Sequence, residues 1–168
     1  MDVCKLATMK IVLAIILAVS FRVVYLTPTE SCPAMCTNRV ELDTSFYAII
    51  AYDSSMHWLF NEAKPAPLSG MEINAIEATL LDAVINYNKK VENEGFRIKP
   101  VENYKRQYVA VFNKKRQKEV WINFFCSPPG SNWRKSIFTV DDGGNCFFSI
   151  KINLITNRYY DLSVNGYA

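Results

Sequence analysis

Apolar residues recur every three or four positions between Ser69 and Gly95, which is the spacing of one face of a helix. Ser69 and Glu72 form an S-x-x-E capping box, in which each side chain accepts a hydrogen bond from the backbone amide of the other residue. A helix should therefore begin at Ser69, and Gly95 is placed to end its run. The apolar face consists of Ile73, Ile76, Leu80, Leu81, Val84 and Tyr87.

Beyond residue 103 the apolar period changes from about 3.6 to 2, which is the period of strands. In the stretch from Cys146 to Leu154, apolar residues alternate with Phe147, Ser149, Lys151 and Asn153, which indicates one buried and one wetter face. A helix followed by meandering strands predicts an α+β fold, with one or more helices packed on a curled antiparallel sheet of about five strands. The predicted strands are 104–112, 119–126, 136–140, 146–154 and 159–164.

The pattern before residue 69 is less regular. The spacing of apolar residues in 42–60 suits a helix, although Tyr47 to Tyr52 alone also fits a strand. Two prolines then break the chain in 61–68. The stretch 27–39 is rich in Pro, Ser, Thr and Asn, which predicts an exposed segment. We therefore divide the chain into a signal peptide (1–20), a leader with a disulfide loop and a possible short helix (21–68), and an α+β domain (69–168).

A short apolar run near the N-terminus predicts export. The run from Ile11 to Ser20 is too short to span a bilayer comfortably, since a spanning helix needs about 20 residues. Ala18 and Ser20 are small residues at the positions that signal peptidase reads, which predicts a cut after Ser20. The product would be periplasmic or extracellular, with no stable transmembrane segment. The alternative is an uncleaved membrane anchor that continues to Leu26.

Cleavage would also remove Cys4, the odd one of five cysteines. Four cysteines in an exported chain predict two disulfides, with three possible pairings. We favour Cys126 with Cys146, because both lie at strand ends beside one loop, which leaves Cys32 with Cys36. A zinc site is disfavoured, because the spacing matches no recognised ligand pattern and an oxidising compartment argues against free thiolates. We predict no metal and no cofactor.

Candidate catalytic groups are few. His57 is the only histidine, and a nucleophilic pair with cysteine would need a free thiolate, which the disulfides remove. Asp141 and Asp142, together with Asn145, could supply oxygen ligands for calcium, but an EF-hand needs more carboxylates and a terminal glutamate. A turn between strands uses the same residue types, so the turn is the preferred interpretation.

Aromatic and basic residues are the remaining binding candidates. Half-buried sheet faces use the same aromatic residues, so a core role competes with a binding role. The weak binding candidates are Tyr108, Trp121, Trp133, Asp141 and Asp142. A basic cluster, with Arg134 and Lys135 expected nearby, suits nucleic acid or anionic lipid. A solvated hairpin explains the cluster as well, and the formal charge of only +3 disfavours nucleic acid. The cluster comprises Lys114, Lys115, Arg116 and Lys118.

The predicted order of elements resembles cystatin-like folds, in which an antiparallel sheet cradles a helix. Cystatins inhibit cysteine proteases through a Q-x-V-x-G hairpin and a later P-W hairpin. Gln107 and Val109 match the first motif, but Val111 stands in place of its glycine. Gln107 also falls inside a predicted strand, and Pro128-Pro129 is separated from Trp133. The resemblance therefore concerns topology, and protease inhibition does not follow from it.

Several C-terminal stretches resemble a family of small exported bacterial proteins of unknown function. The likeness covers roughly the last hundred residues, about the length of one domain, and implies no activity. The stretches are Tyr104–Tyr108, Val120–Asn123, Asp142–Cys146 and Val164–Ala168.

Two functions remain open. The first is a non-catalytic exported domain that binds an unknown protein or envelope partner through a sheet face or its loops, and the absence of a spaced catalytic constellation favours it. The second is a small enzyme or ligand carrier with a pocket between helix and sheet, in which Asp141, Asp161 or Glu119 would be the acting acids. An enclosed cavity with converging acids and His57 would support the second function.

Overall fold

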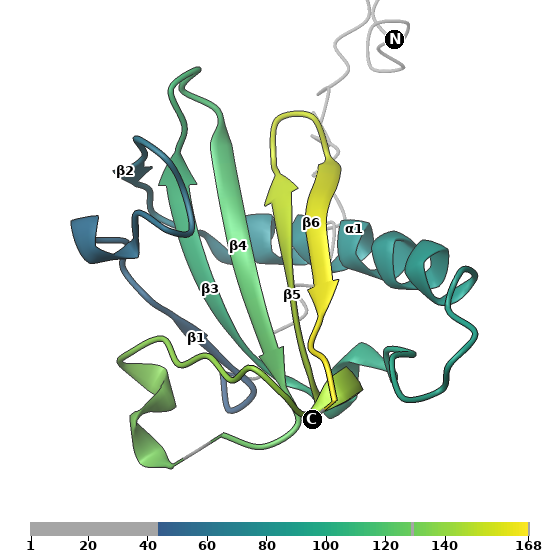
Figure 1. The fold of residues 1–168 in the computed structure, drawn as a ribbon. Coiled ribbons are helices and arrows are strands. Elements are labelled where there is room, and N and C mark those ends of the chain that lie inside the picture. The colour runs from purple at the N-terminus through teal and green to yellow at the C-terminus, as the bar shows by residue number, and fades with distance from the viewer. Residues whose placement is uncertain (1–43, 129, 168) are drawn as a thin grey trace, which may run out of the picture. The chain divides into compact units, whose positions relative to one another are not determined.

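The computed structural model describes residues 44–128 and 130–167. In them one helix packs on a six-stranded mixed sheet that is not closed into a barrel, which is an α+β arrangement (Figure 1). The signal peptide and the Cys32–Cys36 pair predicted above lie outside the described residues. No helix in the described ranges is both long and apolar enough to cross a membrane. The elements are β1 (Tyr47–Ile49), β2 (Lys64–Pro65), α1 (Gly70–Asn88), β3 (Lys105–Phe112), β4 (Lys118–Phe125), β5 (Phe147–Asn153) and β6 (Arg158–Val164).

The predicted start of α1 is confirmed. Ser69 Oγ accepts a hydrogen bond from the Glu72 amide at 3.3 Å, and the Ser69 amide donates to Glu72 Oε2 at 2.8 Å. The helix ends at Asn88, before Gly95. The Asn88 side chain ties this end to the following loop, because it donates to the Ile98 carbonyl at 2.8 Å and accepts from the Ile98 amide at 2.9 Å. The Arg97 guanidinium donates to the Asn88 carbonyl at 3.1 Å, so a side chain binds the last helical carbonyl and Gly95 lies in the loop beyond.

Removing the cap hydroxyl should weaken α1. Ser69→Ala leaves the Glu72 amide without its acceptor, so we expect the free energy of unfolding to fall by about 1 kcal/mol. Thr79→Ala is the matched control, because it also removes an α1 hydroxyl, one that donates only to the Ala75 carbonyl within the helix at 3.4 Å. Urea denaturation measures both. Equal stability of Ser69→Ala and the wild type would contradict the role of the capping box.

Four of the five predicted strands are present and pair in sequence order as an antiparallel meander, β3-β4-β5-β6. The predicted strand 136–140 is wrong, because no strand forms there. The helix expected in 42–60 is also wrong. Instead β1 pairs in parallel with β3, which makes the sheet mixed, and Asp53 then caps a short 3-10 turn by accepting from the Ser55 amide at 2.8 Å. The alternative of a strand in Tyr47–Tyr52 is therefore correct in part.

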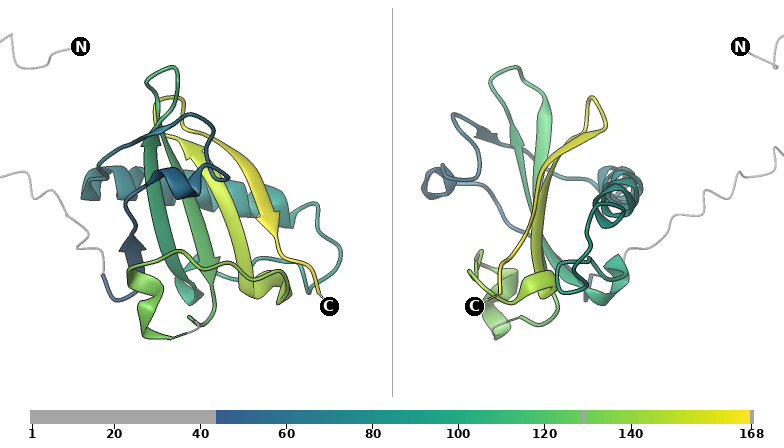
Figure 2. Two further views of the ribbon diagram at one scale, coloured as in Figure 1. Left: turned by 60° about the vertical axis from the view of Figure 1, so that its left-hand side comes forward. Right: turned by 45° about the vertical axis from the view of Figure 1, so that its right-hand side comes forward.

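The sheet is buried on both faces along β3 and β4, whereas β6 is mostly exposed and β5 has the wetter face that its pattern predicted. β5 does alternate between buried and half-buried residues, but β3 and β4 each contain an unbroken run of buried ones. Figure 2 shows α1 on one side of the sheet, here called the inner face, and the chain around residues 50–60 on the other, the outer face. β1, β2 and this covering chain come from the stretch that the sequence assigned to the leader. The outer-face core consists of Ala48, Ile50, Tyr52, Leu59, Phe60, Val109, Val111, Trp121, Phe125 and Trp133.

Residues 130–142, here called the strap, contribute to the covering of the outer face without forming a strand. Their backbone carbonyls are bound by side-chain amides of the sheet and the C-terminal segment, namely those of Gln107, Asn123 and Asn165. These amides replace the strand ladder that the sequence predicted for 136–140. The acceptors are the carbonyls of Trp133 and Ser136 for Gln107, of Phe138 for Asn123, and of Val140 and Asp142 for Asn165.

The two ends of the chain segment that contains the strap are joined by a disulfide between Cys126 and Cys146, which confirms the favoured pairing. The Cys126 amide also donates to the Cys146 carbonyl at 3.0 Å. Within the strap, the Arg134 guanidinium donates to three carbonyls in the chain that leads into and through β1. The strap is therefore tied both to the sheet and to the first described residues.

Candidate binding surface

The structure distributes the sequence candidates over both faces of the sheet. Tyr108 lies in the inner-face core and is only 1% exposed. Trp121 and Trp133 belong to the outer-face core, at 5% and 6% exposure. Asp141 and Asp142 are exposed on the strap. Because Tyr108 and Trp133 are buried on opposite faces of the sheet, their rings serve packing, and the candidates do not form one site.

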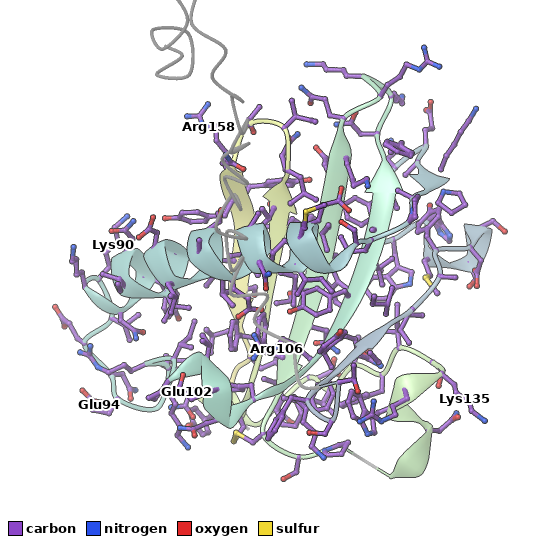
Figure 3. The ribbon with its side chains drawn as sticks, turned by 180° about the vertical axis from the view of Figure 1, so that it is seen from behind. Lys90, Glu94, Glu102, Arg106, Lys135 and Arg158 are labelled. Carbon is purple, nitrogen blue, oxygen red and sulfur yellow. A yellow bond between two sulfur atoms is a disulfide. The ribbon has the colours of Figure 1, made fainter. Side chains whose placement is uncertain are left out.

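Tyr108 belongs to a polar cluster between α1 and β3. Glu77 of α1 accepts from the Arg106 guanidinium at 2.7 Å through both carboxylate oxygens, and from the Tyr108 hydroxyl at 2.7 Å. The Arg106 side chain, labelled in Figure 3, is 12% exposed and that of Glu77 is 26% exposed. Burial, and after it the charge of Glu77, raise the pKa of Tyr108 far above its usual value. The phenol therefore stays protonated and donates, so the cluster holds the helix rather than moving protons.

Two of the acids proposed for an enzyme bind neighbouring side chains and do not meet at one site. Glu119 accepts hydrogen bonds from Asn113 and Asn153, at 2.8 and 3.1 Å. Asp161 pairs with Lys151 at 3.0 Å. Burial, and then the charge of Glu119, raise the pKa of Tyr160 above its ordinary value.

His57 and the turn at Asp141 do not join these acids. His57 is exposed, with its ring 3.3 Å from the Ser54 carbonyl. Gly143 and Gly144 have φ angles of 98° and 52°, which fits the predicted turn. Among the described residues, no group of three or more His, Cys, Asp or Glu side chains could hold a metal.

The outer face carries a groove beside an exposed tryptophan. Trp58 is 54% exposed, and its ring packs edge-on against Trp121 with centroids 5.9 Å apart. Val140 of the strap, 37% exposed, also lines the groove, and Thr139 and Ser149 add hydroxyl groups. The groove has a volume of about 130 Å³. Its lining is Trp58, Trp121, Asn123, Phe138, Thr139, Val140, Phe147, Phe148, Ser149 and Asn165.

This arrangement suits recognition of a partner group. A tryptophan offers a large apolar surface at low cost in conformational entropy, and the surrounding amides and hydroxyls add hydrogen-bonding groups at the edge. Of the sequence candidates, only Trp121 lines the groove. Trp58 was missed because it lies in 42–60, where the spacing of apolar residues predicted a helix. The available signal was a tryptophan beside the only histidine, in a stretch that forms neither helix nor strand.

Comparisons with models of protein families, with curated proteins and with solved structures find no match. The resemblance to exported bacterial proteins therefore stays a prediction. The case for the groove rests on geometry alone.

The basic cluster lies at one end of the sheet, and Arg134 and Lys135 lie at the other. Lys114, Lys115 and Arg116 lie in the turn after β3 ends at Phe112. Arg134 instead bonds the carbonyl of Tyr47, which is paired with the beginning of β3. The expectation that Arg134 and Lys135 lie near the cluster is therefore wrong. Figure 3 shows Lys135 at the end of the sheet opposite to Arg158.

Proposed function

We propose that this chain is an exported, disulfide-stabilised domain that binds a protein or envelope partner without catalysis, through the groove beside Trp58. The observation that carries the proposal is the 54% exposure of Trp58 while its ring is held against the buried Trp121. Exposed tryptophans supported by buried neighbours are the residues that most often dominate binding energy at interfaces. The proposed export depends on the apolar run Ile11–Ser20 and agrees with the oxidised Cys126–Cys146 pair.

The interior favours binding at the surface over an internal pocket. Tyr104, Phe124 and Phe148 are each at most 1% exposed and pack between α1 and the sheet, with Phe124 and Phe148 stacked at 4.2 Å. Glu119 and Asp161 are bound by neighbouring side chains. A ligand carrier would need space where these rings lie, and an enzyme would need acids that meet at one point.

The proposal extends to the fold, which we describe as a cystatin-like core with additions. We propose that α1 and the meander β3-β4-β5-β6 correspond to a cystatin-like core, and the packing of α1 on this meander supports the proposal. In this description β1 and β2 are additions at the β3 edge, and the strap is an extended connection between β4 and β5. A cystatin-like core carries no protease inhibition here, because Gln107 is buried at 0% exposure and binds the strap.

Site-specific crosslinking in producing cells tests the proposed function. A photoreactive benzoylphenylalanine at position 58 should give one discrete adduct in the exported fraction, because the residue lies at the mouth of the groove. The same probe at Leu81, which is 51% exposed on α1, is the matched control and should not give that adduct. With the captured partner purified, Trp58→Ala should weaken binding by about 30-fold or more, since such anchors contribute roughly 2 kcal/mol or more.

Three outcomes would contradict this proposal. The first is the absence of an adduct at position 58, and the second is the same adduct at both positions. The third is unchanged affinity of a Trp58→Ala variant whose melting temperature shows that it is folded. Chemical conversion of the partner by the domain would overturn the non-catalytic part.

A further inference from the structure

We propose that one end of the sheet docks on the surface of an anionic phospholipid bilayer. This surface, here called the hairpin end, consists of the β3–β4 turn (113–117), the β5–β6 turn (154–157), Lys64, Phe112 and Arg158. Both turns lie at the same end because β3 to β6 form an antiparallel meander, and the Leu154 amide donates to the Lys118 carbonyl at 2.9 Å. Figure 1 shows the two loops projecting from one end of the sheet.

The hairpin end has an excess of positive charge. Of the carboxylates nearby, Glu62 pairs with Lys114 at 2.8 Å and Glu72 pairs with Lys118 at 2.6 Å. Glu119 faces the asparagines of the turns. The remaining cations face solvent, and a groove of about 430 Å³ opens beside Phe112. The exposed cations without such a partner are Lys64, Lys115, Arg116 and Arg158. Lys114 is exposed as well, and its partner Glu62 is itself 65% exposed.

In each of the two turns, an asparagine side chain accepts hydrogen bonds from backbone amides of the turn. Asn113 Oδ1 accepts from the amides of Lys115 and Gln117, at 2.9 and 3.0 Å. Asn153 Oδ1 accepts in the same way from the amides of Ile155 and Thr156, at 3.0 and 3.1 Å.

The side chains of Glu119 and Gln117 join the two asparagines. Asn113 and Asn153 each donate to Glu119 Oε1, at 2.8 and 3.1 Å. Each also donates to Gln117 Oε1, at 3.4 and 3.1 Å. The backbone of the two turns, from which the cations and the exposed apolar side chains project, is therefore held in one arrangement, which lowers the entropic cost of docking.

Apolar side chains among these cations favour a bilayer over other polyanions. Ile155 is 66% exposed in the β5–β6 turn, and Phe112 is 38% exposed at the end of β3. At a bilayer, cationic heads meet lipid phosphates while apolar side chains enter the boundary between headgroups and acyl chains. A nucleic acid would neutralise the cations but would offer Ile155 no apolar environment. The geometry therefore fits anionic lipid, a partner distinct from the one proposed for the groove.

Vesicle binding by the full chain tests this inference. The vesicles contain phosphatidylcholine alone or with added phosphatidylglycerol. With the anionic vesicles we expect slower hydrogen exchange in residues 112–118 and 154–158. Replacing Lys114, Lys115 and Arg116 with glutamine should reduce partitioning on the order of 100-fold, because each cation near an anionic surface contributes about five-fold. Ile155→Ser should also reduce it.

The matched controls carry the same changes elsewhere on the molecule. Glutamine at Lys89, Lys90 and Lys99 removes three exposed cations that do not belong to the hairpin end, and Lys90 is labelled in Figure 3. Ile85→Ser removes an exposed isoleucine, 52% exposed on α1. Both controls should bind vesicles as the wild type does. Controls and test variants all retain the N-terminal apolar run, so any binding through that run is the same in all of them. Trp58→Ala should likewise keep lipid binding, so the two proposals can fail separately.

Several results would overturn the inference. Equal partitioning into neutral and anionic vesicles would do so, as would losses in the control variants as large as those at the hairpin end. Exchange that is slowed at the turns by a DNA duplex, but not by anionic vesicles, would assign the surface to nucleic acid instead. Circular dichroism of every variant confirms that a loss of binding is not a loss of folding.

Discussion

Glu77→Ala should lower the free energy of unfolding by about 3 kcal/mol, since removing one partner of a largely buried pair leaves the charge of the other uncompensated. The Arg106 side chain is 12% exposed and would lose the carboxylate that it contacts at 2.7 Å. The Tyr108 hydroxyl would lose its acceptor in the same step. Denaturation in urea, followed by circular dichroism, measures the loss.

The chain offers a matched surface pair as a control for this prediction. Glu94 contacts Arg97 at 2.9 Å, but these two side chains are 79% and 41% exposed. Glu94→Ala should therefore change stability little, because water replaces the lost partner. A double variant, Glu77→Leu with Arg106→Met, should recover most of the loss, since both charges are then removed from the interior. If Glu77→Ala were as mild as Glu94→Ala, the cluster would not be what fixes α1 on the sheet.

Loss of the Cys126–Cys146 disulfide should have a similarly large effect. The bond joins residues separated by 20 positions around a segment without a strand, so its removal greatly increases the freedom of the unfolded chain. Replacing both cysteines with alanine should cost about 3 kcal/mol, on the chain-entropy estimate for a loop of this length. Loss of the disulfide should also speed hydrogen exchange more in the strap than in β3, because the disulfide closes the chain segment that contains the strap.

Reduction of the wild-type protein provides the control. Under dithiothreitol the wild type should unfold at the same denaturant concentration as the double alanine variant under dithiothreitol. If reduced and oxidised wild type had the same midpoint, the disulfide would be present but would not stabilise the domain.

The sequence predicted those parts of the fold in which local pattern and tertiary packing agree. Ser69 and Glu72 are three positions apart, so their capping box can be recognised without the rest of the chain. The strands from β3 to β6 are each long enough to show alternation. β1 has three residues and β2 has two, too few for a period to appear, and each forms only because β3 offers its edge. Residues 136–140 of the strap were predicted to form a strand. The side-chain amides that bind the strap instead come from distant parts of the chain, so the local sequence carries no signal of them.

The candidate surfaces were harder to predict because they join residues that are distant in sequence. Trp58 lies 63 positions before Trp121, and no spacing rule links an exposed tryptophan to a strand so much later in the sequence. Glu77 and Tyr108 are 31 positions apart, so neither predicted the other. The basic turn was recognised, but its fixed orientation depends on Asn153, which belongs to a different hairpin.

The side-chain amides that hold the strap carry no charge. Gln107, Asn123 and Asn165 do not titrate, and their bonds to backbone carbonyls are short-range contacts that added salt does not screen. The wall of the groove at Val140 should therefore keep its position across a wide range of ionic strength. The attraction of Lys115 and Arg116 to lipid phosphates is, in contrast, screened over about 8 Å at physiological salt. Ionic strength should thus release the hairpin end from a bilayer while the groove keeps its partner.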